Sequence, residues 1–194
     1  NEFPTRLTAE MQIVASDLVR QRSRYDMRSY TTYRFNADAS EAERRNWLQL
    51  PSTYNPRTLQ LADEIRSRSG SDADRVRTTL EHLRRGGYEY TLTPPRLGRN
   101  SIDEFLFDTR QGYCEHYASA FVFLMRALDV PARVVTGYQG GELNPVDGFM
   151  TIRQSDAHAW SEVWLQGRGW VRVDPTAIVA PLRIDQGASE IARR

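Results

Sequence analysis

The chain contains no lysine, and all 26 of its basic side chains are arginine. Chemistry that needs an ε-amine, such as a Schiff base or a lysine-dependent phosphate loop, is therefore excluded. The chain also offers no ε-amine for modification or cross-linking. Arginine bias can follow from genome composition alone, so it assigns no function by itself.

Excess charge of one sign is also lacking, since 26 basic and 25 acidic residues leave a formal net charge of +1. Nucleic acids and anionic membrane surfaces attract proteins with a basic excess, so neither is expected as the main partner. The longest apolar stretch, Ala118 to Met125, is far shorter than the roughly 20 residues that cross a bilayer. No signal peptide is visible and the chain begins at Asn1, so we expect a domain taken from a longer protein.

Cysteine is almost absent, because Cys114 is the only one in 194 residues. One thiol forms neither an internal disulfide nor a zinc site built from several cysteines. The chain is nevertheless long enough, and at 40% hydrophobic apolar enough, to bury a core without such cross-links. Cys114 is thus either a buried bystander or a nucleophile.

The order of the expected elements indicates an α+β fold. Helix N-termini are predicted at Asn55–Pro56, Ser71–Asp74 and Ser101–Glu104. Residues 114 to 128 are apolar on nearly every side, which is typical of a buried central helix. Extended segments then follow at short spacing: Ala132 to Tyr138, Phe149 to Arg153, Ala159 to Leu165 and Trp170 to Val173. Helices followed by strands predict an antiparallel β-sheet packed on the central helix.

We expect three regions along the chain. Residues 1–54 form an N-terminal approach segment that packs on or precedes the core, and residues 55–180 form the core itself. Residues 181–194 are expected to be a C-terminal tail. No internal repeat or low-complexity segment interrupts this order.

Cys114 is expected at the N-terminus of the central helix, directly after a loop that contains Gly112. Free amide groups and the positive end of the helix dipole favour an anion at such a position. They favour the reactive thiolate, and they can also hold a developing oxyanion. Because free cysteines are commonly buried, position alone leaves a structural and a catalytic role open.

Three histidines could act as the base. His116 lies two positions from Cys114 on the same helix and is expected to point away from it. His82 lies in a charged helix and is expected to be solvated. His158 instead opens an alternating run in which Trp160 lies on the same face, so it is the favoured candidate.

The carboxylate that orients this imidazole is predicted to be Asp174, which ends the next strand before Pro175. It lies directly opposite His158 if the hairpin turns through a three-residue loop, Leu165 to Gly167, with Gly167 left-handed. A two-residue loop would place the pair on opposite faces of the sheet. The catalytic interpretation therefore predicts an odd loop or a bulge at these glycines, whereas the alternative makes Asp174 a turn residue only.

Four segments resemble the bacterial transglutaminase-like superfamily, most closely its TgpA type, and strong similarity covers residues 101 to 177. The segments are GYCEHYASAF from Gly112, VPARVVTGY from Val130, DAHAWSEVW from Asp156 and GWVRVDPT from Gly169. The resemblance implies the papain-like α+β core with the cysteine at the helix N-terminus. It further implies Cys114 as nucleophile, His158 as general base and Asp174 as orienting carboxylate.

Other family features transfer less directly. Animal transglutaminases use an upstream indole N–H as an oxyanion donor, but no tryptophan lies between Trp47 and Cys114. Tyr90 is a candidate substitute, with packing as the alternative, and Trp160 is a candidate wall of the substrate tunnel or a cross-strand packing residue. Those enzymes also use calcium, yet no loop here has ligand spacing, so neither metal nor cofactor is expected.

The resemblance implies a protein-glutamine gamma-glutamyltransferase whose partners are a glutamine donor and a primary amine acceptor. A cysteine peptidase, amidase or deamidase with the same triad, acting on peptides such as those of the cell wall, is the alternative. A non-catalytic peptide-binding module is the third interpretation. The TgpA likeness implies a periplasmic domain, monomeric in isolation, of an inner-membrane protein whose membrane helices lie outside this chain.

Overall fold

The computed structural model describes residues 4–8, 12–28, 30 and 32–181. Contacts divide the chain into two units, Asn1–Tyr33 and Arg34–Arg194. The first unit contains an antiparallel pair of short strands, β1 (Thr5–Leu7) and β2 (Ile13–Ala15). All the residues singled out above as candidate site residues lie in the second unit.

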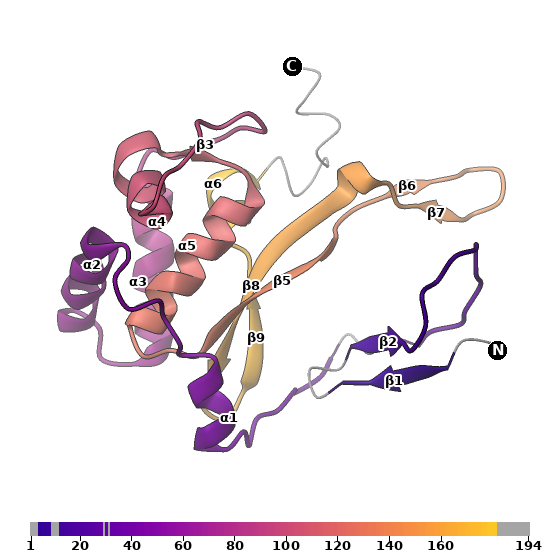
Figure 1. Ribbon diagram of the computed structural model, residues 1–194, viewed down its shortest axis with the longest axis horizontal. Helices are drawn as coiled ribbons and strands as arrows, with labels where there is room; N and C mark the ends of the chain where they lie inside the picture. The colour runs from indigo at the N-terminus through magenta and orange to yellow at the C-terminus, as the bar shows by residue number, and fades with distance from the viewer. Residues whose placement is uncertain (1–3, 9–11, 29, 31, 182–194) are drawn as a thin grey trace. The chain divides into compact units, whose positions relative to one another are not determined.

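The second unit combines helices with short sheets (Figure 1). Its helical elements are α1 (Glu41–Asn46), α2 (Pro56–Ser67), α3 (Asp72–Arg85), α4 (Ser101–Asp103), the π-helix η1 (Glu104–Thr109), α5 (Cys114–Ala127), the 3₁₀-helix η2 (Gln154–Asp156) and α6 (Pro175–Val179). Its strands are β3 (Glu89–Tyr90), β4 (Gln111–Gly112), β5 (Ala132–Tyr138), β6 (Glu142–Leu143), β7 (Met150–Thr151), β8 (Ala157–Leu165) and β9 (Gly169–Val173). The predicted α+β class is confirmed.

The main sheet is antiparallel and has the order β5-β8-β9. Two shorter sheets flank it: β3 pairs with β4 in parallel, and β6 pairs with β7 beyond the ends of β5 and β8. β5 has the predicted bounds, whereas β7 covers only part of the segment predicted to be extended, Phe149 to Arg153.

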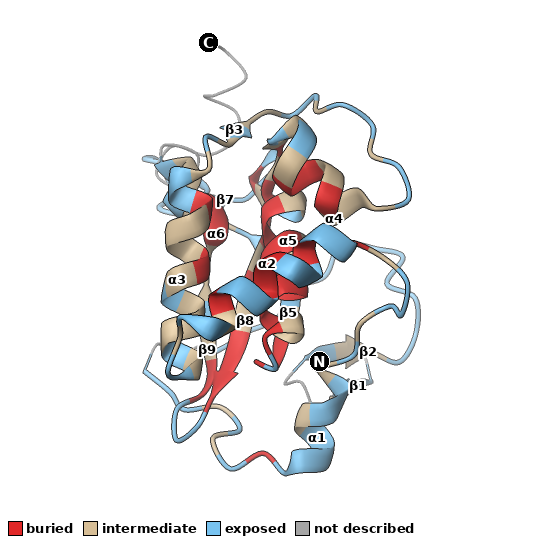
Figure 2. Cartoon of the chain, turned by 90° about the vertical axis from the view of Figure 1, so that its left-hand side faces the viewer, coloured by how far each residue is buried: buried red, intermediate tan, exposed pale blue. Residues whose placement is uncertain are grey.

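The predicted central helix is α5, which packs against β8 and β5 on one side and against α2 and α3 on another (Figure 1). Its side chains are buried on several sides, since Tyr117, Ala120, Phe121 and Leu124 are all inaccessible to solvent. Figure 2 shows the buried residues concentrated along α5 and the adjoining strands. The core of this unit is therefore the interface between one apolar helix and the sheet.

The segment before α1 lies along the outer edge of β9. The backbone N–H of Trp170 donates to the carbonyl of Phe35 at 3.0 Å, and the Trp164 indole donates to the carbonyl of Asn36 at 2.7 Å. Ala39 is buried in a cluster with both tryptophans. Part of the predicted approach segment thus packs on the sheet of the second unit.

The β8–β9 hairpin has an odd loop, as predicted, but its register differs from the one expected. Leu165 pairs with Gly169, so the three-residue loop is Gln166 to Arg168 and not Leu165 to Gly167. Gly167 is left-handed as predicted, with φ of 74°, and Gly169 has the same φ. A Cβ at Gly169 would lie 2.1 Å from the carbonyl oxygen of Phe35, so a contact with a distant segment requires glycine there.

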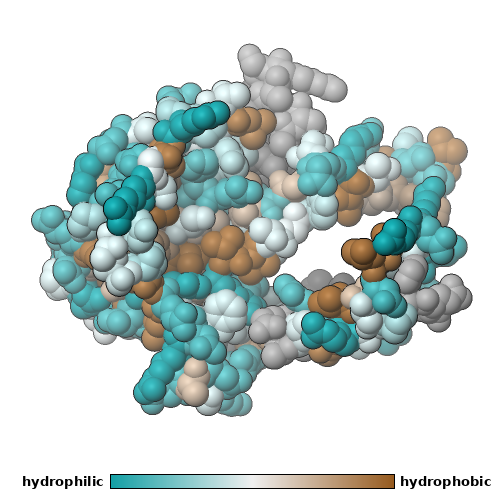
Figure 3. All heavy atoms as spheres, in the orientation of Figure 1, coloured by the Kyte–Doolittle hydropathy of each residue, from teal (hydrophilic) through white to brown (hydrophobic). Residues whose placement is uncertain are grey.

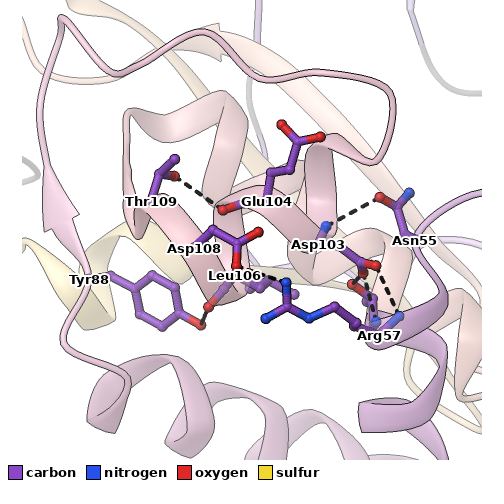
Figure 4. A network of polar contacts seen from close by, with 9 residues as sticks. Asn55, Arg57, Tyr88, Asp103, Glu104, Leu106, Asp108 and Thr109 are labelled. Atoms are coloured by element: carbon purple, nitrogen blue, oxygen red, sulfur yellow. Dashed lines mark hydrogen bonds and ion pairs between the residues drawn. The ribbon is translucent and has the colours of Figure 1, made fainter.

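Two helix N-termini cap each other through side chains that are distant in sequence (Figure 4). The Asp103 carboxylate accepts from the backbone N–H groups of Arg57 and Thr58 at 2.9 and 2.8 Å, which are the first N–H groups of α2. The Asn55 Oδ1 accepts in return from the backbone N–H groups of Ile102 and Asp103 at 3.0 and 3.2 Å. Asn55 and Asp103 are only 4% and 3% exposed, so water cannot replace these bonds.

This arrangement corrects one of the predicted caps and confirms another. Ser101 does not cap α4, whose N-cap is Asn100, and Glu104 instead accepts from the Gly98 N–H at 2.6 Å. The long-range bond from Asn55 takes the place of the local capping pair. In α3, by contrast, Ser71 accepts from the Asp74 N–H at 3.2 Å as predicted.

Within the described residues, no helix is both long enough and apolar enough to cross a lipid bilayer.

We expect Asp103→Ala to lower the free energy of unfolding by about 2 kcal/mol, because it leaves buried N–H groups of α2 without acceptors. Urea unfolding followed by circular dichroism measures the change. The matched control is Asp108→Ala, since Asp108 forms an exposed ion pair with Arg57 at 2.8 Å, which should contribute less than about 1 kcal/mol. Equal losses in the two variants would contradict the assignment of Asp103 as a buried cap.

Candidate active site

Cys114 is the first residue of α5, and its side chain faces the sheet. It is 7% exposed and lies in a small cluster with Ala118 and Ala159, against which Tyr113 packs. Two of these neighbours are alanines, so the helix and strand approach closely at this point. The structure therefore places the thiol where α5 begins and where it meets β8.

His158 lies on β8 and is paired in the sheet with Gly137 of β5. Its Nε2 lies 2.8 Å from Oδ2 of Asp174, which follows β9 directly. The His158 side chain is inaccessible to solvent and that of Asp174 is 11% exposed. The observed register offsets Asp174 by two positions from the point directly opposite His158 that the sequence predicted. The odd loop still leaves both residues on one face of the hairpin, so their side chains meet.

The second ring nitrogen of His158, Nδ1, is not bonded to Asp174. Nδ1 is buried and has no nitrogen or oxygen partner among the described residues. A hydrogen bond with Cys114 raises the pKa of the His158 ring. Because Nε2 is already bonded to Asp174, Nδ1 is the nitrogen left for the sulfur. The imidazole thus lies between the carboxylate and the thiol.

Opposing influences act on the pKa of His158. Burial is the largest and lowers the pKa, because it disfavours the charged ring. Hydrogen bonds to Asp174 and Cys114, together with their negative charges, act the other way and prevail. The pKa of His158 is consequently raised above its ordinary value of 6.5. This environment favours the protonated form of the His158 ring.

Asp174 has a second structural role besides its bond to His158. Its Oδ1 accepts from the Thr176 N–H at 3.1 Å and so caps the N-terminus of α6. The two interpretations given above for Asp174, orienting carboxylate and turn residue, are therefore compatible. Oδ2 contacts the imidazole, and Oδ1 caps the helix that follows the turn. Helix capping fixes the carboxylate in place for the imidazole.

Trp160 lies beside His158, whereas Tyr90 lies on strand β3, which pairs with the strand before α5. The Trp160 ring stacks beside His158, with centroids 6.2 Å apart and planes 24° apart. Tyr90 pairs with Gly112 at the strand before α5, and its ring stacks on Tyr117 at 6.4 Å. The roles suggested for them, tunnel wall and oxyanion donor, stay predictions.

The other two histidines are not part of this arrangement. His116 accepts from the Tyr113 N–H at 3.3 Å through Nδ1, and its ring packs on Phe105 and Tyr113. His82 was predicted to be solvated but is half-buried on α3. Burial lowers the pKa of both residues below its ordinary value, whereas the pKa of His158 is raised overall.

Two adjoining hollows lie along one face of α5. This face is next to the face that carries the Cys114 thiol. The first, of about 230 Å³, is bordered by Tyr113 and Glu115, and the second, of about 360 Å³, by Val122. Ile102 and Ser119 belong to the walls of both. Figure 3 shows apolar side chains gathered in this area, over α5 and β5. Tyr113 thus separates the thiol from an apolar recess.

Among the described residues, no group of three or more His, Cys, Asp or Glu side chains is arranged to hold a metal ion.

A thiol at the start of a buried helix, facing a histidine and a carboxylate on an antiparallel sheet, defines a papain-like class of α+β protein. The model of the transglutaminase-like superfamily matches residues 59–175. The chain therefore belongs to the transglutaminase-like superfamily, as the sequence motifs indicated. The papain-like core expected from them is confirmed.

Individual relatives agree with this assignment. The chain is 43% identical over 190 residues to a protein-glutamine gamma-glutamyltransferase of Pseudomonas aeruginosa, an alignment that covers 98% of the chain. It spans only 28% of the length of that relative.

Solved structures are similar too. The periplasmic domain of TgpA from Pseudomonas aeruginosa, bound to ethylmercury, matches with a TM-score of 0.90 and 43% identity, over 94% of this chain and 66% of that one. A putative cysteine protease from Cytophaga hutchinsonii matches with a TM-score of 0.54 and 25% identity, over 77% of this chain and 47% of that one.

We expect Asp174→Asn to lower the pKa of His158, because the hydrogen bond and negative charge that raise it are weakened. NMR titration of the histidine ring protons measures this change, with His82 and His116 as internal controls. In the wild type, the raised pKa makes His158 stabilise the fold at low pH, and this contribution is lost as the pH rises through the folded value. An unchanged His158 titration in the variant would contradict the pairing.

Proposed function

We propose that this domain is a transglutaminase-type cysteine acyltransferase acting on glutamine side chains. The observation that carries the proposal is the placement of the His158 imidazole between Asp174 and Cys114 at the start of α5. In this assignment Cys114 is the nucleophile, His158 the acid and base, and Asp174 the carboxylate that orients the ring.

The first half-reaction forms a thioester. The Cys114 thiolate attacks the γ-carboxamide carbon of glutamine, and the carbonyl oxygen becomes an oxyanion. Backbone N–H groups and the positive dipole end at the N-terminus of α5 are suited to stabilise this charge. As the C–N bond breaks, the His158 imidazolium transfers its proton to the leaving nitrogen, and ammonia departs. The products are a thioester on Cys114 and a neutral His158.

The second half-reaction transfers the acyl group. Neutral His158 removes a proton from a primary amine, which attacks the thioester carbon. Cleavage of the C–S bond regenerates the thiolate next to the imidazolium and leaves a substituted amide. Water in place of the amine gives glutamate instead, so exclusion of water from the site favours transfer over deamidation.

Geometry further supports this division of labour between the two ring nitrogens. Nε2 is bonded to Asp174, so only Nδ1 can exchange protons with substrate groups bound at the sulfur. The carboxylate fixes which nitrogen carries a proton in the neutral ring, and it stabilises the imidazolium when that forms. Burial of the His158 side chain keeps the proton from exchanging freely with solvent.

Two neighbouring residues are proposed to contact substrate. Trp160, stacked beside His158, would form one wall of the site, and Tyr90 would place its hydroxyl near the oxyanion. The recess bordered by Tyr113 and Glu115 would receive residues that flank the reactive glutamine. The natural donor is thus proposed to be a glutamine-containing protein or peptide, and the acceptor a primary amine.

A cysteine peptidase or amidase is the second candidate. The similarity to a putative cysteine protease from Cytophaga hutchinsonii supports it. Formation of the acyl-enzyme is the same in both reactions, so the products distinguish them.

The periplasmic relative supports a periplasmic location for this chain, as a domain of a longer membrane protein.

We expect Cys114→Ala and His158→Gln to reduce amine incorporation into a glutamine-containing peptide by more than about a thousandfold, because each removes a group that forms or breaks the thioester. Mass spectrometry of a reaction with a fluorescent primary amine measures three products: the amine adduct, the glutamate product and cleaved peptide. With no lysine in the chain, no ε-amine of the domain competes as an acceptor.

The matched control is His82→Gln, which replaces a half-buried histidine of α3 outside the site and should retain activity. Thermal unfolding verifies that every variant is folded. Amine incorporation that persists in Cys114→Ala would refute the proposed nucleophile, whereas peptide cleavage without adduct would favour the peptidase.

A further inference from the structure

Arg172 links three elements around the imidazole–carboxylate pair. It lies on β9, two positions before Asp174 and therefore on the same side of the strand. Its Nη2 group lies 2.8 Å from Oε1 of Gln139, the residue after β5, and 3.2 Å from Oδ2 of Asp174. Its guanidinium carbon lies 4.9 Å from the centre of the Trp160 ring. One side chain thus contacts residues of β8 and residues that follow β5 and β9.

The same carboxylate oxygen receives both the imidazole and the guanidinium. Oδ2 of Asp174 lies 2.8 Å from His158 Nε2 and 3.2 Å from Arg172 Nη2, while Oδ1 accepts from the Thr176 N–H. Three donors from separate elements therefore hold one carboxylate. The Asp174 side chain is 11% exposed and that of Arg172 is 47% exposed, so the carboxylate end of this ion pair is buried while the guanidinium reaches solvent.

The tryptophan holds the arginine from the other side. Trp160 lies over Gly137, where a Cβ would come within 2.8 Å of the ring, and its Nε1 is buried. The indole is therefore confined between strand β5 and the His158 ring. A guanidinium over a confined ring has both a cation–π contact and a flat surface that limits its rotation.

We propose that Arg172 is a positioning residue which, clamped between Gln139 and Trp160, holds the Asp174 carboxylate against His158 for acyl transfer. This inference rests on the proposed function of the Cys114 site. Arg172 was not among the site residues predicted from the sequence. It lies two positions before Asp174, however, and this spacing places both side chains on the same face of an extended strand.

The charge of Arg172 should also affect the imidazole. The titratable and charged groups that face His158 are Cys114 on α5 and Asp174 before α6, with Arg172 acting through Asp174. The residue paired with His158 on β5 is Gly137, which carries no charge. A guanidinium that shares Oδ2 weakens that oxygen as a partner for the imidazolium. Without Arg172 the carboxylate is less firmly positioned, but the Thr176 N–H still bonds its Oδ1, so the loss of the positive charge should raise the pKa of His158.

The test uses Arg172→Met, which keeps an unbranched apolar side chain on Trp160 but removes both hydrogen bonds and the charge. We expect kcat/KM for amine incorporation to fall about tenfold, the effect of losing a hydrogen bond to a charged group. We expect the alkaline limb of the pH profile to move up by about half a pH unit, because the imidazolium persists to higher pH. A purely structural role would lower the rate without moving this limb.

Alkylation of Cys114 by iodoacetamide gives a second readout that requires no glutamine substrate. The chain has a single thiol, so the rate as a function of pH reports the thiolate–imidazolium pair directly. The alkylation rate should change stepwise where the imidazolium loses its proton, and this step should move in the same direction as the alkaline limb of turnover. Arg45→Met, which replaces an exposed arginine of α1 paired with Glu41, is the matched control and should change neither profile.

Gln139→Leu tests the clamp without altering Arg172 itself. It should lower kcat/KM by a smaller factor than Arg172→Met, and it should add nothing in the Arg172→Met background, because both changes remove the same support. Additive losses in the double variant, or an alkaline limb that stays in place or moves down in Arg172→Met, would overturn the inference. Failure of the proposed function is distinguishable, since wild-type Cys114 would then react no faster than an ordinary thiol.

Discussion

The close approach of α5 to β8 is the constraint on which the site depends. Cys114 belongs to the helix and His158 to the strand, and the side chains between them include Ala118 and Ala159. Ser161 strengthens the contact by donating to the Ala118 carbonyl of α5 at 3.3 Å. Larger side chains at the alanines would push the two backbones apart, and the sulfur would lose its partner even if every catalytic group remained. Packing of small residues therefore determines whether the chemistry is available.

Much of this architecture is readable from local sequence. The all-round apolar character of residues 114 to 128 predicted a buried helix, and α5 covers Cys114–Ala127. Alternation predicted the face of β8 that carries His158, and the requirement for an odd hairpin loop was met. The family motifs added the functional hypothesis that local patterns alone could not supply. These features depend on neighbours in the sequence, which is why they could be predicted.

The features that were missed depend on contacts between distant segments. The hairpin register is shifted because Gly169 must accommodate the carbonyl of Phe35, which no pattern within the hairpin reveals. Ser101 satisfied the rules for a cap, but the N–H groups of Ile102 and Asp103 bond instead to the side chain of Asn55, which is distant in sequence. Arg172 was overlooked because an exposed arginine on an edge strand is ordinary until its neighbours are known. Tertiary structure decided each of these cases.

The segment that contains Phe35 has a consequence for how the molecule behaves in a crowded compartment. β9 is an edge of the main sheet, and such edges offer unpaired backbone groups to strands of other molecules. The Phe35 carbonyl already occupies the outward N–H of Trp170, and two tryptophan rings pack beneath the same stretch. The chain thereby covers part of its own edge strand, β9, and hinders the addition of a strand from another molecule. The residues before α1 thus oppose aggregation through the sheet edge, and this role is independent of catalysis.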